Sequence, residues 1–172
     1  MKELKVTMHN GRNGSPRHND RTFLTDMSES EIKEQADHIN QEKSGDNVIW
    51  NLYPGMTFAD AELKYYKDTF TDSLLAINEK YKKQRHPERC RSIENLYHNN
   101  KTCPEETILQ IGRKDDKVSE DIAKKCFIEF VDYMNEYSRN HSNLFQILNV
   151  DYSVNSEYSQ GQICIHPCSR LE

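Results

Sequence analysis

One histidine, His18, lies in a short segment, SPRHNDRTF, that is rich in charged and amide side chains. Arg17 and Arg21 flank it, and guanidinium groups suit phosphate because they present several donors in one plane. Asn19 and Asp20 follow it and offer hydrogen-bond partners that could orient an imidazole. From local composition alone, a histidine in such a segment is more often an ordinary solvated loop residue. The flanking side chains are what favour a phosphodiester site, with His18 as a candidate nucleophile.

A second group of chemically active side chains lies in the segment CIHPC near the C-terminus. Cysteine and histidine at alternate positions of a strand share one face and can bind zinc. Here these residues are Cys164, His166 and Cys168. A structural zinc site usually has four ligands in paired short spacings, and the C-x-x-C pair is missing, although Cys90 or Cys103 could add a ligand. Chance clustering is the commoner origin, so this metal site is the weaker alternative.

The most basic stretch of the chain is KYKKQRHPERCR, residues 80–91. The helix dipole favours cations at the C-terminal end of a helix, so a solvated helix end explains the stretch slightly better than a phosphate-binding patch does. If the protein binds nucleic acid, we expect contacts at Lys82, Lys83, Arg85, Arg89 and Arg91.

The composition limits the classes of protein to be considered. A chain of 172 residues with 35% hydrophobic and 30% charged residues suits a single domain, residues 1–172. The net charge of −5 counts against tight DNA binding unless the basic residues cluster. Five cysteines without a secretion signal argue against a disulfide framework, and no apolar run is long enough to cross a bilayer. We therefore expect a cytoplasmic protein without membrane contact.

Alternating apolar and polar residues predict several strands. They fall at residues 4–8, 48–53, 107–112, 144–154 and 162–166, and the last two could pair as a hairpin. A turn is expected at residues 10–16, because Asn-Gly and Ser-Pro both favour turns.

Two long helices are predicted, one beginning after Thr57 and ending before Pro87, the other beginning after Ser119. Short helices are expected at residues 92–98 and after Ser28, which forms a capping box with Glu31. The apolar faces of the long helices comprise Ala59, Leu63, Tyr66, Phe70, Leu74, Ile77 and Tyr81, and Ile122, Cys126, Phe127, Phe130, Val131, Met134 and Tyr137. Strands outnumber long helices without strict alternation. This favours an α+β fold, an antiparallel sheet with helices on one face.

The segments RHNDRTF and ADHINQEKSGDNVIWNLY resemble the start of the Pre/Mob family of plasmid mobilisation relaxases, also called plasmid recombination enzymes. In that family a K/R-H-N-E/D-R segment carries the proposed nucleophilic histidine, and an I-N-x-x-x-x-x-x-N segment follows, here from Ile39 to Asn47. The later stretch YKKQRHPERCRSIENLYHNNKTCPEETILQIG resembles a bacterial branch of the family. The resemblance runs through most of the chain and implies the N-terminal relaxase domain of a longer natural chain.

The resemblance also implies a fold and an activity. Such relaxases are similar to the HUH endonucleases, in which helices flank an antiparallel sheet and one DNA strand is nicked at a transfer origin. The match places the nucleophile, which forms a covalent link to the phosphate, at His18. A divalent metal, Mn or Mg, polarises the scissile phosphate in an active enzyme. The implied partner is DNA, as a single strand or an origin hairpin, contacted by Arg17, Asn19, Arg21 and the basic stretch.

The metal motif of the family is where this sequence departs. The pattern H-x-D-E-x-x-P-H-x-H falls on SVNSEYSQGQ, where Ser153, Ser156, Gln160 and Gln162 replace the first histidine, the motif glutamate and the last two histidines. Neutral hydroxyl and amide groups are poor ligands for a catalytic divalent ion compared with imidazole and carboxylate. The motif is therefore degenerate.

Three hypotheses follow. The first is a relaxase-like domain that binds DNA of a mobile element and has lost, or nearly lost, metal-dependent nicking. The second is an active relaxase with a rearranged metal site, for instance one built from Cys164, His166 and Cys168. The third is a protein–protein interaction module on the same fold, which the acidic net charge favours. One continuous basic face beside His18 would support DNA binding, and scattered charge would support the third hypothesis.

Overall fold

A computed structural model of the chain describes residues 5–12, 14–28, 30–31, 48–112, 118–154 and 159–167. In this part of the chain a five-stranded antiparallel sheet has the strand order β1-β3-β5-β4-β2. The strands are β1 (Val6–Arg12), β2 (Val48–Asn51), β3 (Glu105–Ile111), β4 (Phe145–Val154) and β5 (Ser159–Pro167). The predicted α+β class with an antiparallel sheet is confirmed.

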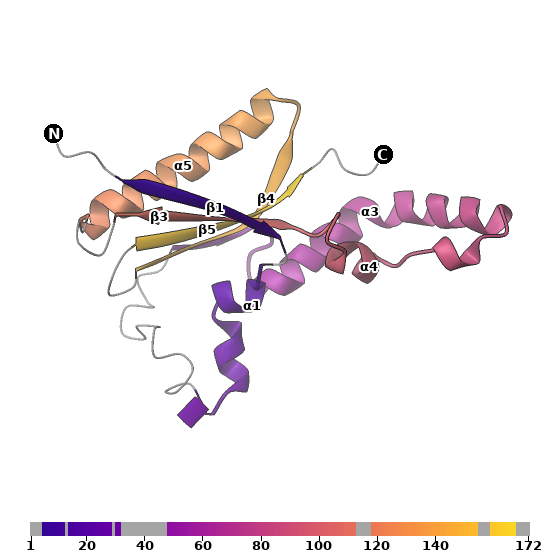
Figure 1. Cartoon of the computed structure of the whole chain (residues 1–172), viewed down its shortest axis with the longest axis horizontal. Helices are drawn as coiled ribbons and strands as arrows, with labels where there is room; N and C mark the ends of the chain where they lie inside the picture. The colour runs from indigo at the N-terminus through magenta and orange to yellow at the C-terminus, as the bar shows by residue number, and fades with distance from the viewer. Residues whose placement is uncertain are drawn as a thin grey trace.

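Helices connect these strands and cover the sheet (Figure 1). The long helices are α3 (Phe58–Lys83) and α5 (Glu120–Asn140), and the short ones are α1 (Pro16–Asn19) and α4 (Ile93–His98). Two 3-10 helices, η1 (Thr22–Asp26) and η3 (Pro87–Arg89), follow α1 and α3. Within the described residues, no helix is both long enough and apolar enough to cross a membrane.

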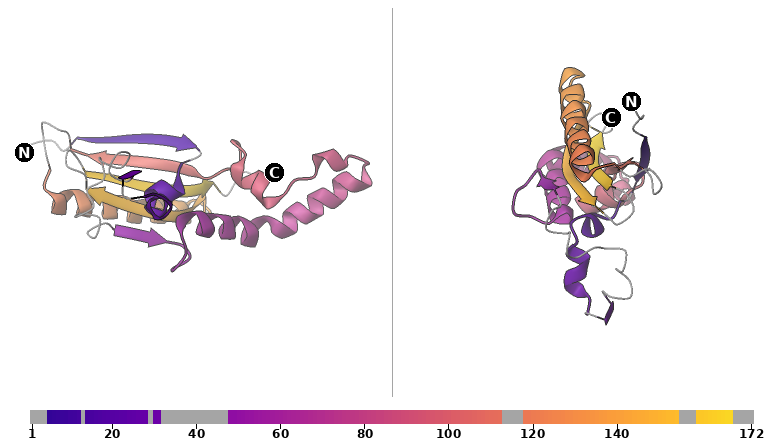
Figure 2. Two further views of the ribbon diagram at one scale, coloured as in Figure 1. Left: turned by 90° about the horizontal axis from the view of Figure 1, so that it is seen from below. Right: turned by 90° about the vertical axis from the view of Figure 1, so that its left-hand side faces the viewer.

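The two faces of the sheet are covered by different helices. Phe127 of α5 packs in a core cluster with Val150, Tyr152 and Ile163 of the central strands. The alternate β4 residue, Asn149, faces the other way and bonds to α3. Thus α5 lies on one side of the sheet and α1 on the other (Figures 1 and 2). The prediction that helices cover one face is wrong, because Asn149 of β4 bonds to Glu62 of α3 on the face opposite α5.

The helix α3 is much longer than the sheet that supports it. Its first half is buried at Phe58, Ala61, Glu62, Tyr66 and Phe70. Tyr66 and Phe70 form a second cluster with Leu96 of α4. The second half of α3 projects beyond the sheet as an arm (Figure 2), and its predicted apolar face is exposed at Ile77.

Local sequence signals located most of the boundaries. Thr57 caps α3 by accepting a hydrogen bond from the Asp60 N–H, and Ser92 caps α4 in a capping box. Ser28 and Glu31 make the two reciprocal bonds of the predicted capping box. The predicted hairpin is the β4–β5 pair, in which Tyr152 lies opposite Gly161.

One further local prediction is wrong, and another is confirmed in part. Residues 10–12 continue β1 instead of turning, because the strand pairs with β3 along its whole length, as far as Arg12 opposite Glu105. The predicted apolar face of α5 is confirmed for the residues that lie in or against the core, Cys126, Phe127, Phe130, Val131 and Met134. Ile122 and Tyr137, at the two ends of that face, are exposed, and Ala123 is buried instead.

Gly161 shows how closely α5 approaches the sheet. A Cβ atom at this position would lie 1.8 Å from a ring carbon of Phe127, whereas a Cβ at Gly11 of β1 would meet nothing within 4 Å. We predict that Gly161→Ala lowers the free energy of unfolding by about 1–3 kcal/mol, the usual cost of overpacking a core. Urea unfolding measures the change, with Gly11→Ala as the control that should shift the midpoint little. Equal midpoints for the two variants would contradict this packing.

Candidate functional site

The short helix α1, which carries His18, is attached to the fold by Asp20. The Oδ2 atom of Asp20 accepts a hydrogen bond of 2.7 Å from the N–H of Phe58, the first residue of α3. Its Oδ1 atom accepts bonds from the N–H and hydroxyl of Thr22 at 3.0 and 2.6 Å. An acidic side chain at a helix N-terminus satisfies a free N–H and interacts favourably with the dipole. One carboxylate therefore joins α1, η1 and α3.

Asn19 gives α1 a second anchor. It is 5% exposed, and its Nδ2 donates a 2.5 Å hydrogen bond to Glu106 of β3. His18, the next residue back, is half-buried and stacks on the ring of Phe23 with centroids 5.3 Å apart and planes 9° from parallel. From the sequence, we expected Asn19 and Asp20 to orient the imidazole through hydrogen bonds. In the structure their hydrogen bonds attach α1 to the sheet and to α3, and the Phe23 ring supports the imidazole face.

The two arginines beside His18 have different surroundings. Arg17 is exposed and forms an ion pair with Asp26, whose pKa is lowered mainly by the hydrogen bond from this guanidinium. Arg21 has a left-handed backbone conformation, with φ of 62°, and its Nη1 donates to the carbonyl oxygen of His18 at 3.0 Å. The Arg21 bond closes the turn that follows α1. Arg17 is the more accessible of the two charges.

Beneath this turn lies a buried carboxyl group, Asp151 of β4, which the sequence hypothesis did not single out. Its side chain is 2% exposed. Among the described residues, neither its Oδ1 nor the Nε of Arg21 has a hydrogen-bond partner. Burial raises the pKa of Asp151 to about 7, the nearby Arg21 charge opposes this shift, and Asp20 adds to it. Asp20 and Arg21, in the turn after His18, are therefore close enough to β4 for their charges to affect the pKa of Asp151.

The positions of the degenerate metal motif lie on the same hairpin. Ser153 is opposite Gln160 and Asp151 is opposite Gln162 in the β4–β5 register, while Ser156 lies outside the described residues. Hydroxyl and amide groups at three of these positions do not make a catalytic site for a divalent ion. Nor do the described residues contain any group of three or more His, Cys, Asp or Glu side chains that could hold a metal. The residues present therefore do not fit the metal that the resemblance implies.

The alternative ligands Cys164 and His166 are packed inside the protein. Cys164 is 7% exposed, and burial raises the pKa of its thiol well above the usual value. His166 is 3% exposed and lies against the rings of Tyr65, Tyr66 and Phe70, with centroids 5.0–5.6 Å apart. Both residues lie on the sheet face that packs against α3. Their spacing predicted that they share a face. The third residue of the set, Cys168, lies outside the described residues.

The basic stretch lies far from His18. Lys82 and Lys83 lie in the last turn of α3, and α3 has 26 residues, so it is about 39 Å long. His18 is close to the first turn of that helix, through Asp20. The predicted contacts at Lys82, Lys83, Arg85, Arg89 and Arg91 are all exposed. Lys82 and Lys83 end the arm, and the chain then returns along α3, where Arg91 bonds to Asn78. These basic residues do not form one continuous basic face with Arg17 and Arg21.

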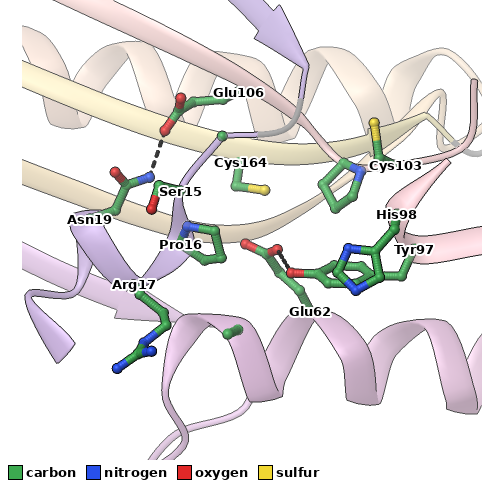
Figure 3. A pocket seen from close by; sticks show the side chains of 13 residues that line it. Ser15, Pro16, Arg17, Asn19, Glu62, Tyr97, His98, Cys103, Glu106 and Cys164 are labelled. Carbon is green, nitrogen blue, oxygen red and sulfur yellow. Dashed lines mark hydrogen bonds between the residues drawn. The ribbon is translucent and has the colours of Figure 1, made fainter. Parts of the chain in front are cut away.

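A cavity of about 360 Å³ opens between α1, the start of α3, α4 and the sheet (Figure 3). Its central polar group is Glu62, which is 3% exposed and accepts hydrogen bonds from the Tyr97 hydroxyl at 2.8 Å and the Asn149 amide at 2.6 Å. Burial raises the pKa of Glu62, and bonds from Asn149, Tyr97 and Cys164 oppose that shift. A buried acid with a raised pKa in a cavity is typical of a binding or catalytic site.

Sequence reasoning missed Glu62, although a signal was present. Glu62 lies four residues before Tyr66 and so falls on the apolar side of the predicted helix, where a carboxylate is unexpected. The partners of Glu62 come from β4, α4 and β5, and only the tertiary fold brings them together.

Comparisons with protein-family models, with curated proteins and with solved structures find no match.

The raised pKa of Asp151 predicts a pH dependence of stability. The folded state retains the Asp151 proton up to about pH 7, while an ordinary aspartate loses it near 3.8, so this group stabilises the fold at low pH. The contribution falls between about pH 4 and pH 7, by at most about 1.4 kcal/mol per pH unit. We predict that Asp151→Asn loses less stability than the wild type between pH 5 and pH 8, measured by urea unfolding. The exposed substitution Asp132→Asn is the control, and a wild-type pH profile in Asp151→Asn would contradict the prediction.

Proposed function

We propose that this chain is a relaxase-like domain of the Pre/Mob type that binds single-stranded DNA of a mobile element, with little or no metal-dependent nicking. The observation that carries the proposal is the proximity of two segments far apart in the sequence. Arg21 and Asp20 lie close enough to Asp151 of β4 for their charges to affect its pKa, and Asp151 is on the hairpin that bears the motif positions Ser153 and Gln160. The resemblance implies that the nucleophile and the metal motif act on the same phosphate, which requires such proximity.

The loss of nicking is inferred from the donor groups at the hairpin. Activation of a phosphodiester by a metal ion needs ligands that bind a divalent cation strongly, and serine and glutamine side chains do not. The carboxylate closest to His18 in sequence, Asp20, is held by hydrogen bonds from Thr22 and Phe58 that attach α1 to α3. The groups that remain accessible, Arg17 and the half-buried His18, suit phosphate binding.

The arm formed by the second half of α3 supplies the other expected DNA contacts. The arm places Lys82 and Lys83, at its far end, nearly the full helix length of about 39 Å from the turn after α1, so a bound strand would meet two separate basic regions. Binding through phosphate contacts is weakened by salt in proportion to the number of contacts. Each region should therefore contribute separately to the salt dependence.

A second candidate function is a protein–protein interaction module. The outer strands of the sheet expose apolar side chains, with Val6 and Met8 on β1 49% and 55% exposed and Ile49 and Trp50 on β2 51% and 45% exposed. Such edges can pair with another chain. The separation of the basic residues from His18 and the net charge of −5 also favour this function.

Salt-dependent binding of a fluorescein-labelled oligothymidylate distinguishes the two. We expect Lys82→Ala with Lys83→Ala to reduce the slope of log affinity against log salt by about 1.4, which is about 0.7 for each phosphate contact on a single strand. Arg17→Ala should reduce it by about 0.7. Lys125→Ala, on the exposed face of α5, is the control and should change neither slope nor affinity. Absence of salt-dependent binding at micromolar protein would overturn DNA binding and leave the interaction module.

A further inference from the structure

The cavity around Glu62 opens beside the segment that carries His18. Ser15, Pro16, Arg17 and Asn19 line one side of it, and Tyr97 and His98 line the other. A DNA strand that passes over α1 would therefore have the mouth of this cavity next to its bases.

The charges around the cavity favour a base over a phosphate. Glu62 and Glu106 both line it, and Arg17 is the one lysine or arginine among its described lining residues. Figure 3 shows the Arg17 guanidinium pointing away from the cavity, where it pairs with Asp26. Phosphate would be repelled inside, whereas a group that donates hydrogen bonds would be attracted.

The shape and walls of the cavity suit a flat heterocycle. The rings of Tyr97 and His98 lie 4.8 Å apart at one wall, and Pro16 and Pro104 add apolar surface. Aromatic side chains commonly stack on unpaired bases. The Glu62 carboxyl points into the space beside these rings (Figure 3).

We propose that this cavity binds an unpaired nucleobase that carries an exocyclic amino group, with Glu62 accepting a hydrogen bond from that amino group. The inference deepens the proposed DNA-binding function and rests on it. Carboxyl side chains recognise the cytosine amino group in this way. Thymine and uracil present a carbonyl oxygen at the same position. That oxygen and the oxygens of an ionised Glu62 are all acceptors, so no hydrogen bond would form between them.

Free nucleosides test the cavity separately from DNA binding. The side-chain amide resonances of Asn19, which lines the cavity, are followed by NMR in the intact chain during titration with deoxycytidine or deoxyuridine. We expect deoxycytidine to bind at least about tenfold more tightly, as expected for a good hydrogen-bonded pair. Equal affinities, or no shift with either nucleoside, would overturn the inference.

Variants of Glu62 test the residue itself. Glu62→Gln can donate to a carbonyl oxygen as well as accept from an amino group, so it should lose most of the preference for deoxycytidine, and Glu62→Met should abolish it. Glu79→Met, on the exposed part of the same helix, is the matched control and should behave as the wild type. If Glu62→Met does not fold, the wild-type comparison of the two nucleosides still decides the question.

The outcomes separate this inference from the proposed function. Salt-dependent oligonucleotide binding without any nucleoside preference would overturn the inference and leave DNA binding in place. Nucleoside preference without oligonucleotide binding would overturn the DNA-binding function. Shifts at Asn19 with propylguanidinium but with neither nucleoside would show a site for small cations and overturn the inference.

Discussion

The carboxylate of Asp20 is the interaction on which the arrangement of the site depends. It bonds the first N–H of α3 and closes the turn through Thr22, so a four-residue helix that could not persist alone is fixed against a 26-residue one. Because α3 is itself packed on the sheet, this bond fixes the position of the His18 segment relative to the sheet. Asn19 and Glu106 add the second point of attachment.

The two faces of the sheet differ in the side chains that they bury. The face under α5 is apolar and closely packed, to the extent that Gly161 leaves no space for a Cβ beside Phe127. The opposite face buries Glu62, Asn149 and Asp151 beneath α1 and α3. Buried polar groups cost free energy unless they are paired, so their concentration on one face indicates a site and not a means of stabilisation. The raised pKa values of Glu62 and Asp151 are the consequence of that burial.

The sequence predicted the elements of the fold better than it predicted the site. Caps at Thr57 and Ser92 and the β4–β5 hairpin are determined by local patterns, and all three are present. Asp151 alternates with Val150 and Tyr152, so its strand pattern alone places it on a solvated face. It is buried instead, on a face near Asp20 and Arg21, which lie far away in the sequence. Such contacts between distant segments cannot be derived from local periodicity, and the same holds for the partners of Glu62.

The central claim is that the His18 segment and the β4–β5 hairpin form a site for nucleic acid without a catalytic metal. Calorimetric titration of the purified protein with manganese and with zinc tests this claim most directly. The account predicts no stoichiometric binding of either ion, because serine and glutamine occupy the positions where strong ligands are needed. Stoichiometric manganese binding that His18→Ala or Asp151→Asn abolishes would contradict it and would identify an active, rearranged metal site.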